Sequence, residues 1–188
     1  MAQYRAGERV EYRVTWLEMT ERPGFAWPPM PLGQEAALLR AQTPPAWYFM
    51  ALYNAVGEDY AWTDKQETPR GELAGWLADP GVALYTLMAH GWPQGFFVLD
   101  SREDGVCDLA YFGLVPQAIG KGLGSWLLQA AILTGWERPG TRKMTVNTCT
   151  LDHPRALIRY QRFGFEPVRA EVHARVLTRD QTFQQPLL

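Results

Sequence analysis

Three glycines alternate with other residues in the segment Gly120-Lys-Gly122-Leu-Gly124, between a predicted strand and a predicted helix. The first amides of a helix have no partner within the helix, and the helix dipole adds positive potential at the same end. Glycine lets a bulky anion approach these amides because it has no side chain in the way. A helix start of this kind is suited to binding a pyrophosphate group.

The spacing of the glycines argues against the two commonest nucleotide-binding loops. A Walker A loop requires serine or threonine directly after its lysine, but Lys121 is followed by Gly122. The dinucleotide fingerprint reads G-x-G-x-x-G near the first strand of a βαβ unit, whereas this segment reads G-x-G-x-G after several strands. A glycine-rich connection that holds no ligand is the alternative interpretation at this point.

A second group of chemistry-bearing side chains lies at the end of a later predicted strand and along the helix after it. Asp152 or His153 could cap this helix, and Gly164 suits its end. Ala156 and Tyr160 are four residues apart and therefore share one face of the helix. The phenol of Tyr160 could serve as a general acid, or it could simply pack in the core with its hydroxyl satisfied.

Together the two segments resemble motifs A and B of the GNAT superfamily, which comprises acyl-CoA-dependent N-acyltransferases and mostly acetyltransferases. The first motif is Q-x-x-G-x-G at Gln117–Gly122, preceded by the end of a strand. The second is A-x-x-x-Y-x-x-x-G-F at Ala156–Phe165. The two motifs occur in the order and at the separation of that family. They cover residues 107–166, and the elements predicted upstream also fit the GNAT plan.

The resemblance implies an acetyl-CoA site made largely of backbone atoms. The strand before the first motif would end beside the pantetheine arm, and the amides of the glycine turn would hold the pyrophosphate. One residue departs from the pattern, because many family members have asparagine where this chain has His153. The residues assigned to acetyl-CoA on this ground are Leu114, Val115, Gln117, Ile119, Gly120, Lys121, Gly122, Leu123, Gly124, Ser125 and His153.

The chemistry that the resemblance implies is direct attack of an amine nitrogen on the acetyl thioester. Tyr160 matches the tyrosine that protonates the departing thiolate in many family members, and amides at the strand end, near Leu114, would stabilise the oxyanion. Asp108 lies near where several members carry an acidic base, and its alternative interpretation is a solvent-facing strand residue. Asp64 and Glu103 are weaker candidates for the base. The competing function is a non-catalytic domain that binds acetyl-CoA without transferring its acetyl group.

The acceptor is expected to be a primary amine of a small molecule or a peptide, bound by the N-terminal half. Trp, Tyr and Phe occur 8 times each, and most of these rings are expected to fill the core. Trp27, in a proline-rich segment, is the best candidate for a ring over the cleft. The three histidines and two cysteines have no metal-ligand spacing, so we expect no metal.

The charge balance excludes some classes of partner. With 18 basic and 20 acidic side chains the formal net charge is −2, so neither nucleic acid nor an anionic membrane is an expected partner. No segment reaches the roughly 18 apolar residues of a membrane helix, and the first residues lack a signal-peptide core. Two widely separated cysteines fit a reduced cytoplasmic protein, a monomer or a homodimer.

The surrounding pattern predicts one domain over residues 1–188, with a polar tail from about 179. Strands joined by hairpins, followed by strand–helix–strand, predict the fold class α/β (α+β): a mixed, mostly antiparallel central sheet with helices on both faces. Strands are predicted at 10–16, 82–89, 96–99, 107–115, 144–149 and 165–177. Helices are predicted at 34–41, 47–56, 70–78, 123–136 and 154–163.

Overall fold

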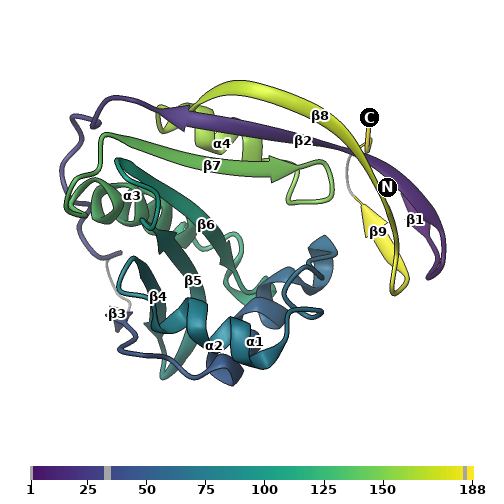
Figure 1. The fold of residues 1–188 in the computed structure, drawn as a ribbon, viewed down its shortest axis with the longest axis horizontal. Coiled ribbons are helices and arrows are strands. Elements are labelled where there is room, and N and C mark those ends of the chain that lie inside the picture. Colours follow the sequence, from purple (N-terminus) through teal and green to yellow (C-terminus); the bar gives the residue numbers. More distant parts are fainter. Residues whose placement is uncertain (1, 32–34, 184–185) are drawn as a thin grey trace.

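A seven-stranded sheet forms the centre of the computed structural model, which describes residues 2–31, 35–183 and 186–188 (Figure 1). Its strand order is β3-β4-β5-β6-β7-β2-β8, and each neighbouring pair is antiparallel except β6 and β7. The mixed, mostly antiparallel sheet predicted from the sequence is thereby confirmed. The strands are β1 (Ala2–Tyr4), β2 (Arg9–Met19), β3 (Ala36–Arg40), β4 (Val82–Ala89), β5 (Trp92–Asp100), β6 (Val106–Leu114), β7 (Lys143–Cys149), β8 (Glu166–Val176) and β9 (Gln181–Phe183).

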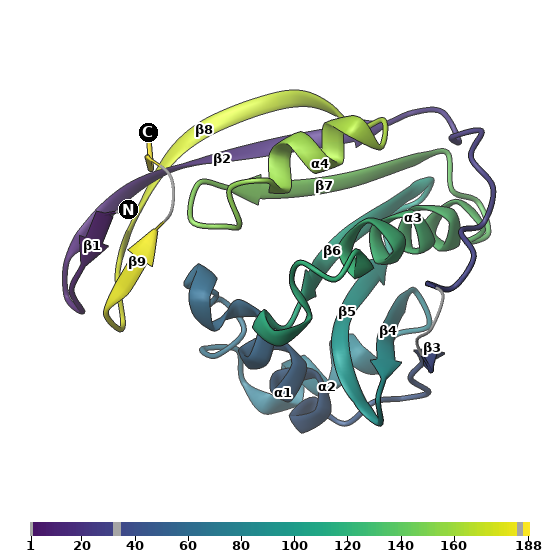
Figure 2. The same cartoon turned by 180° about the vertical axis from the view of Figure 1, so that it is seen from behind.

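Helices cover both faces of the sheet, as expected. Figures 1 and 2 view the molecule from opposite sides, with α1 and α2 on one face and α3 and α4 on the other. The α-helices are α1 (Ala46–Gly57), α2 (Arg70–Ala78), α3 (Leu123–Trp136) and α4 (Ala156–Arg162), and the short 3-10 helices are η1 (Glu58–Tyr60) and η2 (Pro116–Ala118). Gly113 of β6 has no room for a side chain because Val56 of α1 lies against it. This close approach seats α1 directly on the strand that borders the site.

The parallel pair β6–β7 is short and then opens. The two strands pair only over Val106–Asp108 and Lys143–Thr145, although both continue beyond these residues. A parallel connection requires a crossover, and α3 supplies it between the two strands. Beyond Asp108, β6 remains paired with β5, while β7 remains paired with β2. The backbone edges that face each other across this opening are therefore free to receive a ligand.

The aromatic residues mainly build the core, as the sequence suggested. Phe49, Tyr53, Phe96, Phe97 and Phe165 are all fully buried, and the main cluster joins rings from the helices and from the sheet. The ring of Phe49 meets the rings of Phe96 and Tyr111 edge to face, and such pairs are stabilised beyond the area they bury. The concentration of rings under α1 leaves that helix rigidly packed on the sheet.

One predicted helix is a strand. Residues 36–40 of the helix predicted at 34–41 form β3, which pairs with β4 at the edge of the sheet, and Gln34 lies outside the described residues. Alanine and leucine favour a helix, but hydrogen bonding to an available sheet edge overrides this weak preference. The connection from β4 to β5 is a tight turn in which His90 and Gly91 take left-handed conformations, and β5 begins at Trp92 rather than at the predicted residue 96.

The sequence predicts a polar tail from about residue 179, and this prediction is wrong for residues 181–183. Residues 181–183 form β9, which pairs antiparallel with β1. Phe183 and Leu187 are buried in a second small core with Val10, Leu151 and Leu177. Phe183, Leu187 and Leu188 are irregularly spaced among polar residues and give no strand periodicity, so the sequence alone could not reveal this contact.

Replacing Phe183 with alanine tests this correction. Removing the ring leaves a cavity beside Tyr4 in the small core, so we expect the free energy of unfolding to fall by about 3 kcal/mol. Urea denaturation measures the change, with Thr182→Ala, exposed on the same strand, as the control. Equal stability of the Phe183 variant and the wild type would mean that this segment is the unattached tail predicted from the sequence.

Candidate active site

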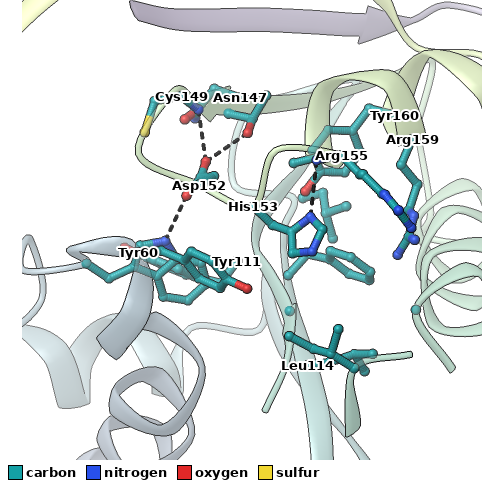
Figure 3. A pocket seen from close by; sticks show the side chains of 18 of the residues that line it. Tyr60, Tyr111, Leu114, Asn147, Cys149, Asp152, His153, Arg155, Arg159 and Tyr160 are labelled. Carbon is teal, nitrogen blue, oxygen red and sulfur yellow. Dashed lines mark hydrogen bonds between the residues drawn. The ribbon is translucent and has the colours of Figure 1, made fainter. Parts of the chain in front are cut away.

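The opening between β6 and β7 leads into a cavity of about 650 Å³ (Figure 3). Its walls come from the diverging strands β6 and β7, the glycine turn, the start of α4, and η1 with the loop after it. Parts of β2 and β8 complete the walls. The lining residues include Leu109–Leu114, Asn147–Cys149, Gly120, Gly122, Gly124, Ser125, His153, Arg159, Tyr160, Tyr12, Tyr60, Trp62, Asp64 and Arg175. One cavity thus joins both motifs singled out in the sequence.

The glycine turn has the backbone that its residues suggested. Gly120 and Gly122 have φ values of 84° and 78°, a left-handed conformation that side chains rarely adopt. Helix α3 begins directly after Gly122, and no side chain caps its first amides. At Gly124 the Arg159 guanidinium occupies the place of a side chain. These amides and this guanidinium together make an anion site at one end of the cavity.

The other residues predicted to contact acetyl-CoA divide into two groups. Leu114, Ile119 and Ser125 line the cavity beside the three glycines. Val115, Gln117, Lys121 and Leu123 are not among its lining residues. The amide expected to stabilise the oxyanion at the strand end is also engaged, because Val115 N–H donates to the Gln94 carbonyl at 3.0 Å.

Tyr160 lies on α4 and is only 6% exposed. Its ring packs against Phe112 of β6 and Phe165, and the residue lines the cavity. Burial is the main cause that raises the pKa of Tyr160, and the Asp152 carboxylate raises it further. The phenol is therefore protonated at neutral pH and can donate a proton into the cavity.

The prediction that Asp152 or His153 caps α4 is wrong. The helix begins at Ala156, and no side chain caps its start. Asp152 instead accepts hydrogen bonds from the Cys149 amide, the Thr148 hydroxyl and the Trp62 indole (Figure 3). His153 Nδ1 accepts from the Arg155 amide at 3.1 Å, and burial, with two nearby arginines, lowers the pKa of His153. Helix α4 therefore begins only after the segment in which Asp152 contacts the loop after η1.

Asp108 does not lie where the resemblance would place the base. It sits in the closed, paired part of β6 and is not among the cavity-lining residues. Its carboxylate accepts a hydrogen bond of 2.6 Å from the Thr145 hydroxyl. Burial is the main cause that raises the pKa of Asp108, opposed by this hydrogen bond. Glu103, in the hairpin before β6, does not line the cavity either.

The aromatic wall of the cavity differs from the one predicted. Trp27 is 48% exposed, and its segment lies on α3, where Trp126 Nε1 and Gln129 Nε2 donate to the Pro28 and Ala26 carbonyls. It does not line the cavity. Besides Tyr160 and His153, the rings that do so are Tyr12, Tyr60, Trp62, Tyr111 and Phe112. Among these, Tyr12 comes from β2, which only strand pairing brings to the site.

The described residues offer neither a metal site nor a membrane span. In residues 2–31, 35–183 and 186–188, no three His, Cys, Asp or Glu side chains gather in a way that could hold a metal ion. The helices of the same ranges are too short or too polar to cross a membrane. Cys107 and Cys149 are both free thiols.

A mixed sheet whose parallel pair opens above a glycine-rich helix start is the architecture expected of a GNAT protein. The family model described as "Acetyltransferase (GNAT) family" matches residues 38–165, which is more than half of the sequence. The chain therefore belongs to the GNAT acetyltransferase family. No curated protein matches the sequence.

Solved structures share the fold at low sequence identity. A GCN5-related N-acetyltransferase from Kribbella flavida has 21% identity and a TM-score of 0.58, covering 88% of this chain and 58% of that protein. A tandem GNAT protein from the clavulanic acid biosynthesis pathway has 14% identity and a TM-score of 0.62, covering 92% and 55%. An aminoglycoside acetyltransferase from an uncultured soil sample, solved with trehalose, has 14% identity and a TM-score of 0.55, covering 68% and 86%. The chain spans little more than half of the first two proteins.

The position of Asp108 predicts a pH-dependent stability change in Asp108→Asn. Because the folded-state pKa lies above the ordinary value of 3.8, the fold loses stability as the pH rises from 3.8 to the folded-state pKa, and the full cost of the buried charge is present above it. The asparagine variant, which can still accept from Thr145, is therefore expected to gain stability at pH 7 relative to the wild type. This gain should vanish below pH 3.8.

Urea denaturation across this pH range measures the effect. Asp104→Asn, at an exposed position in the neighbouring hairpin, is the control. A stability difference between Asp108→Asn and the wild type that does not change with pH would contradict the buried position of this carboxyl group.

Proposed function

We propose that the chain transfers an acetyl group from acetyl-CoA to a primary amine of a small molecule or peptide by direct attack. The observation that carries the proposal is the single cavity in which an anion site and a protonated, buried phenol meet at an opened strand pair. Solved structures named as acetyltransferases share this fold, and one of them is named for aminoglycosides, which supports a small-molecule acceptor.

The donor half of the cavity fits the shape and charge of a CoA thioester. The free amides at the start of α3 would bind the pyrophosphate, with the Arg159 guanidinium beside Gly124 as a further positive charge. The pantetheine arm would run along β6 at Leu114 and extend into the opening. Acetyl-CoA would supply an activated acyl group whose carbonyl carbon accepts the amine.

The transfer step uses groups on both sides of the thioester. The neutral amine attacks the carbonyl carbon, a C–N bond forms, and the C–S bond breaks as the thiolate leaves. Tyr160 would donate its proton to the departing sulfur and regain one from the nitrogen after the amide forms. Amides of β6 beyond Asp108, which lack a β7 partner, would stabilise the oxyanion in place of the engaged Val115 amide.

The second candidate is a non-catalytic domain that binds acetyl-CoA. Both candidates require the anion site, but only the enzyme requires an acid at the sulfur and an acceptor subsite. Two free cysteines suit a reducing compartment, so we propose a cytoplasmic location for either function. A calorimetric titration of acetyl-CoA followed by thiol release with a panel of amines separates the two.

The acid role predicts the behaviour of Tyr160→Phe. Removing the hydroxyl should lower kcat by about 10²-fold while leaving the acetyl-CoA dissociation constant within a factor of two. Thiol release under saturating acetyl-CoA measures kcat, and calorimetry measures binding. Turnover equal to the wild type would remove Tyr160 from the mechanism but leave the acetyl-CoA site intact.

The anion site predicts the behaviour of Gly122→Val. A branched side chain cannot easily adopt the positive φ at this position, so the amides at the start of α3 should turn away and acetyl-CoA binding should weaken at least about tenfold. Gly7→Val is the matched control, because Gly7 also has a positive φ and lies outside the cavity lining. Unchanged affinity in Gly122→Val would exclude the glycine turn as the pyrophosphate site.

A further inference from the structure

We propose that Asp64 binds the ammonium group of the acceptor and takes its proton before attack, which makes single-charged amines the substrate class. This inference rests on the proposed function. Sequence reasoning ranked Asp64 as a weak candidate for the base, because nothing in the sequence connects it to the two motifs. The structure places it in the lining of the same cavity.

Two phenols donate hydrogen bonds to the Asp64 carboxylate. The Tyr53 hydroxyl donates to one carboxylate oxygen at 2.6 Å, and the Tyr111 hydroxyl donates to the other. A carboxylate has about four acceptor sites, so two donors leave capacity for an ammonium group. The residue is also exposed and lines the cavity, so that an incoming ammonium can reach it. The two phenols thus fix the orientation of the carboxylate.

The charged groups around Asp64 are directed elsewhere. The Lys65 ammonium lies over the rings of Trp76 and Tyr111. The Arg175 guanidinium, facing the cavity from β8, donates to the Ala61 carbonyl and the Thr63 hydroxyl. Asp152 lies at the other edge of Trp62, whose indole donates to it. Within the described ranges Asp64 makes no ion pair, so an incoming ammonium would meet an anion without a cationic partner.

The loop that carries Asp64 is fixed from several directions. Trp62 packs so closely over the end of α1 that Gly57 has no room for a side chain. Ala61 adopts a left-handed φ of 56°, and Arg175 binds the loop on both sides of Trp62. These contacts hold the carboxylate in place before any substrate arrives, which is the arrangement a proton acceptor requires.

Asp64 and Tyr160 approach the opening from opposite faces of the sheet. Tyr111 points toward α1 and α2, where its ring meets Phe49 and its hydroxyl meets Asp64. The next residue, Phe112, points the other way and contacts Tyr160. A thioester lying along β6 would therefore have the acid on one side and the carboxylate on the other. That geometry suits a nucleophile arriving opposite the leaving group's proton donor.

The protons balance with these two groups. The ammonium gives one proton to the Asp64 carboxylate and becomes a neutral amine with a free lone pair. After the C–N bond forms and the C–S bond breaks, the thiolate takes a proton from Tyr160, and Tyr160 is reprotonated from the nitrogen of the new amide. Asp64 then releases its proton to solvent, so that one proton is released per acetyl transfer.

The surroundings also restrict the substrate. The rings of Trp62 and Tyr111 offer an apolar wall with π faces, which favours an ammonium on an aromatic or aliphatic body. Arg155 and Arg175 line the same cavity, in addition to the Arg159 proposed for the pyrophosphate, and would repel further positive charges. The site thus suits a monoamine such as an arylalkylamine and disfavours polycations such as polyamines.

The test compares Asp64→Asn with wild type on phenethylamine and on spermidine. At pH 7 we expect kcat/KM for phenethylamine to fall by about 10²-fold in the variant, with the acetyl-CoA dissociation constant unchanged. The deficit should shrink as the pH rises toward the amine pKa, because free amine then needs no base. Glu67→Gln, an exposed carboxylate in the same loop region, is the control and should match wild type.

A second variant and the comparison of the two amines distinguish the possible outcomes. Tyr111→Phe removes one orienting hydrogen bond and should reduce kcat/KM by about tenfold without changing thermal stability by more than a few degrees. The inference would be overturned if Asp64→Asn turned over phenethylamine as fast as the wild type at every pH, or if the wild type preferred spermidine to phenethylamine. Either result would leave the proposed function standing. No wild-type turnover on any amine, despite acetyl-CoA binding, would overturn both.

Discussion

The short pairing of β6 with β7 is the constraint on which the site depends. Only three residues on each strand are joined, after which each strand follows its other neighbour and the sheet opens. The crossover helix α3 must begin beside this opening, and its free amides therefore point at it. The close packing of α1 against Gly113 holds β6 on the face of the sheet that α1 covers.

The alternation of side chains along β6 then assigns two different tasks to its two faces. Phe112 and Leu114 belong to the face of α3 and α4, where the anion site and Tyr160 lie. Tyr111 belongs to the face of α1, where it joins Tyr53 around Asp64. Under the proposed function, one strand would separate the donor side from the acceptor side, and the two would meet at the opening beside it.

The features that could be predicted from the sequence depend on local residue pattern, whereas those that could not depend on how the strands pair. The glycine turn and α3 were predictable because positive φ and helix starts follow from residue type, and Tyr160 was predicted from the resemblance of Ala156–Phe165 to the second GNAT motif. The cavity walls from β2 and β8 were not predictable, since Tyr12 and Arg175 reach the site only through strand register. For the same reason residues 36–40 form β3 where residue preference predicts a helix, and Asp108, which the family resemblance favours as the base, lies outside the cavity lining.

A crystal structure of the chain with bound CoA and an amine tests the central claim most directly. The account predicts the pyrophosphate on the amides at the start of α3, the sulfur within hydrogen-bonding reach of the Tyr160 hydroxyl, and the nitrogen beside the Asp64 carboxylate across β6. CoA bound outside the opening, or an amine held on the same face of the sheet as Tyr160 and away from Asp64, would contradict it.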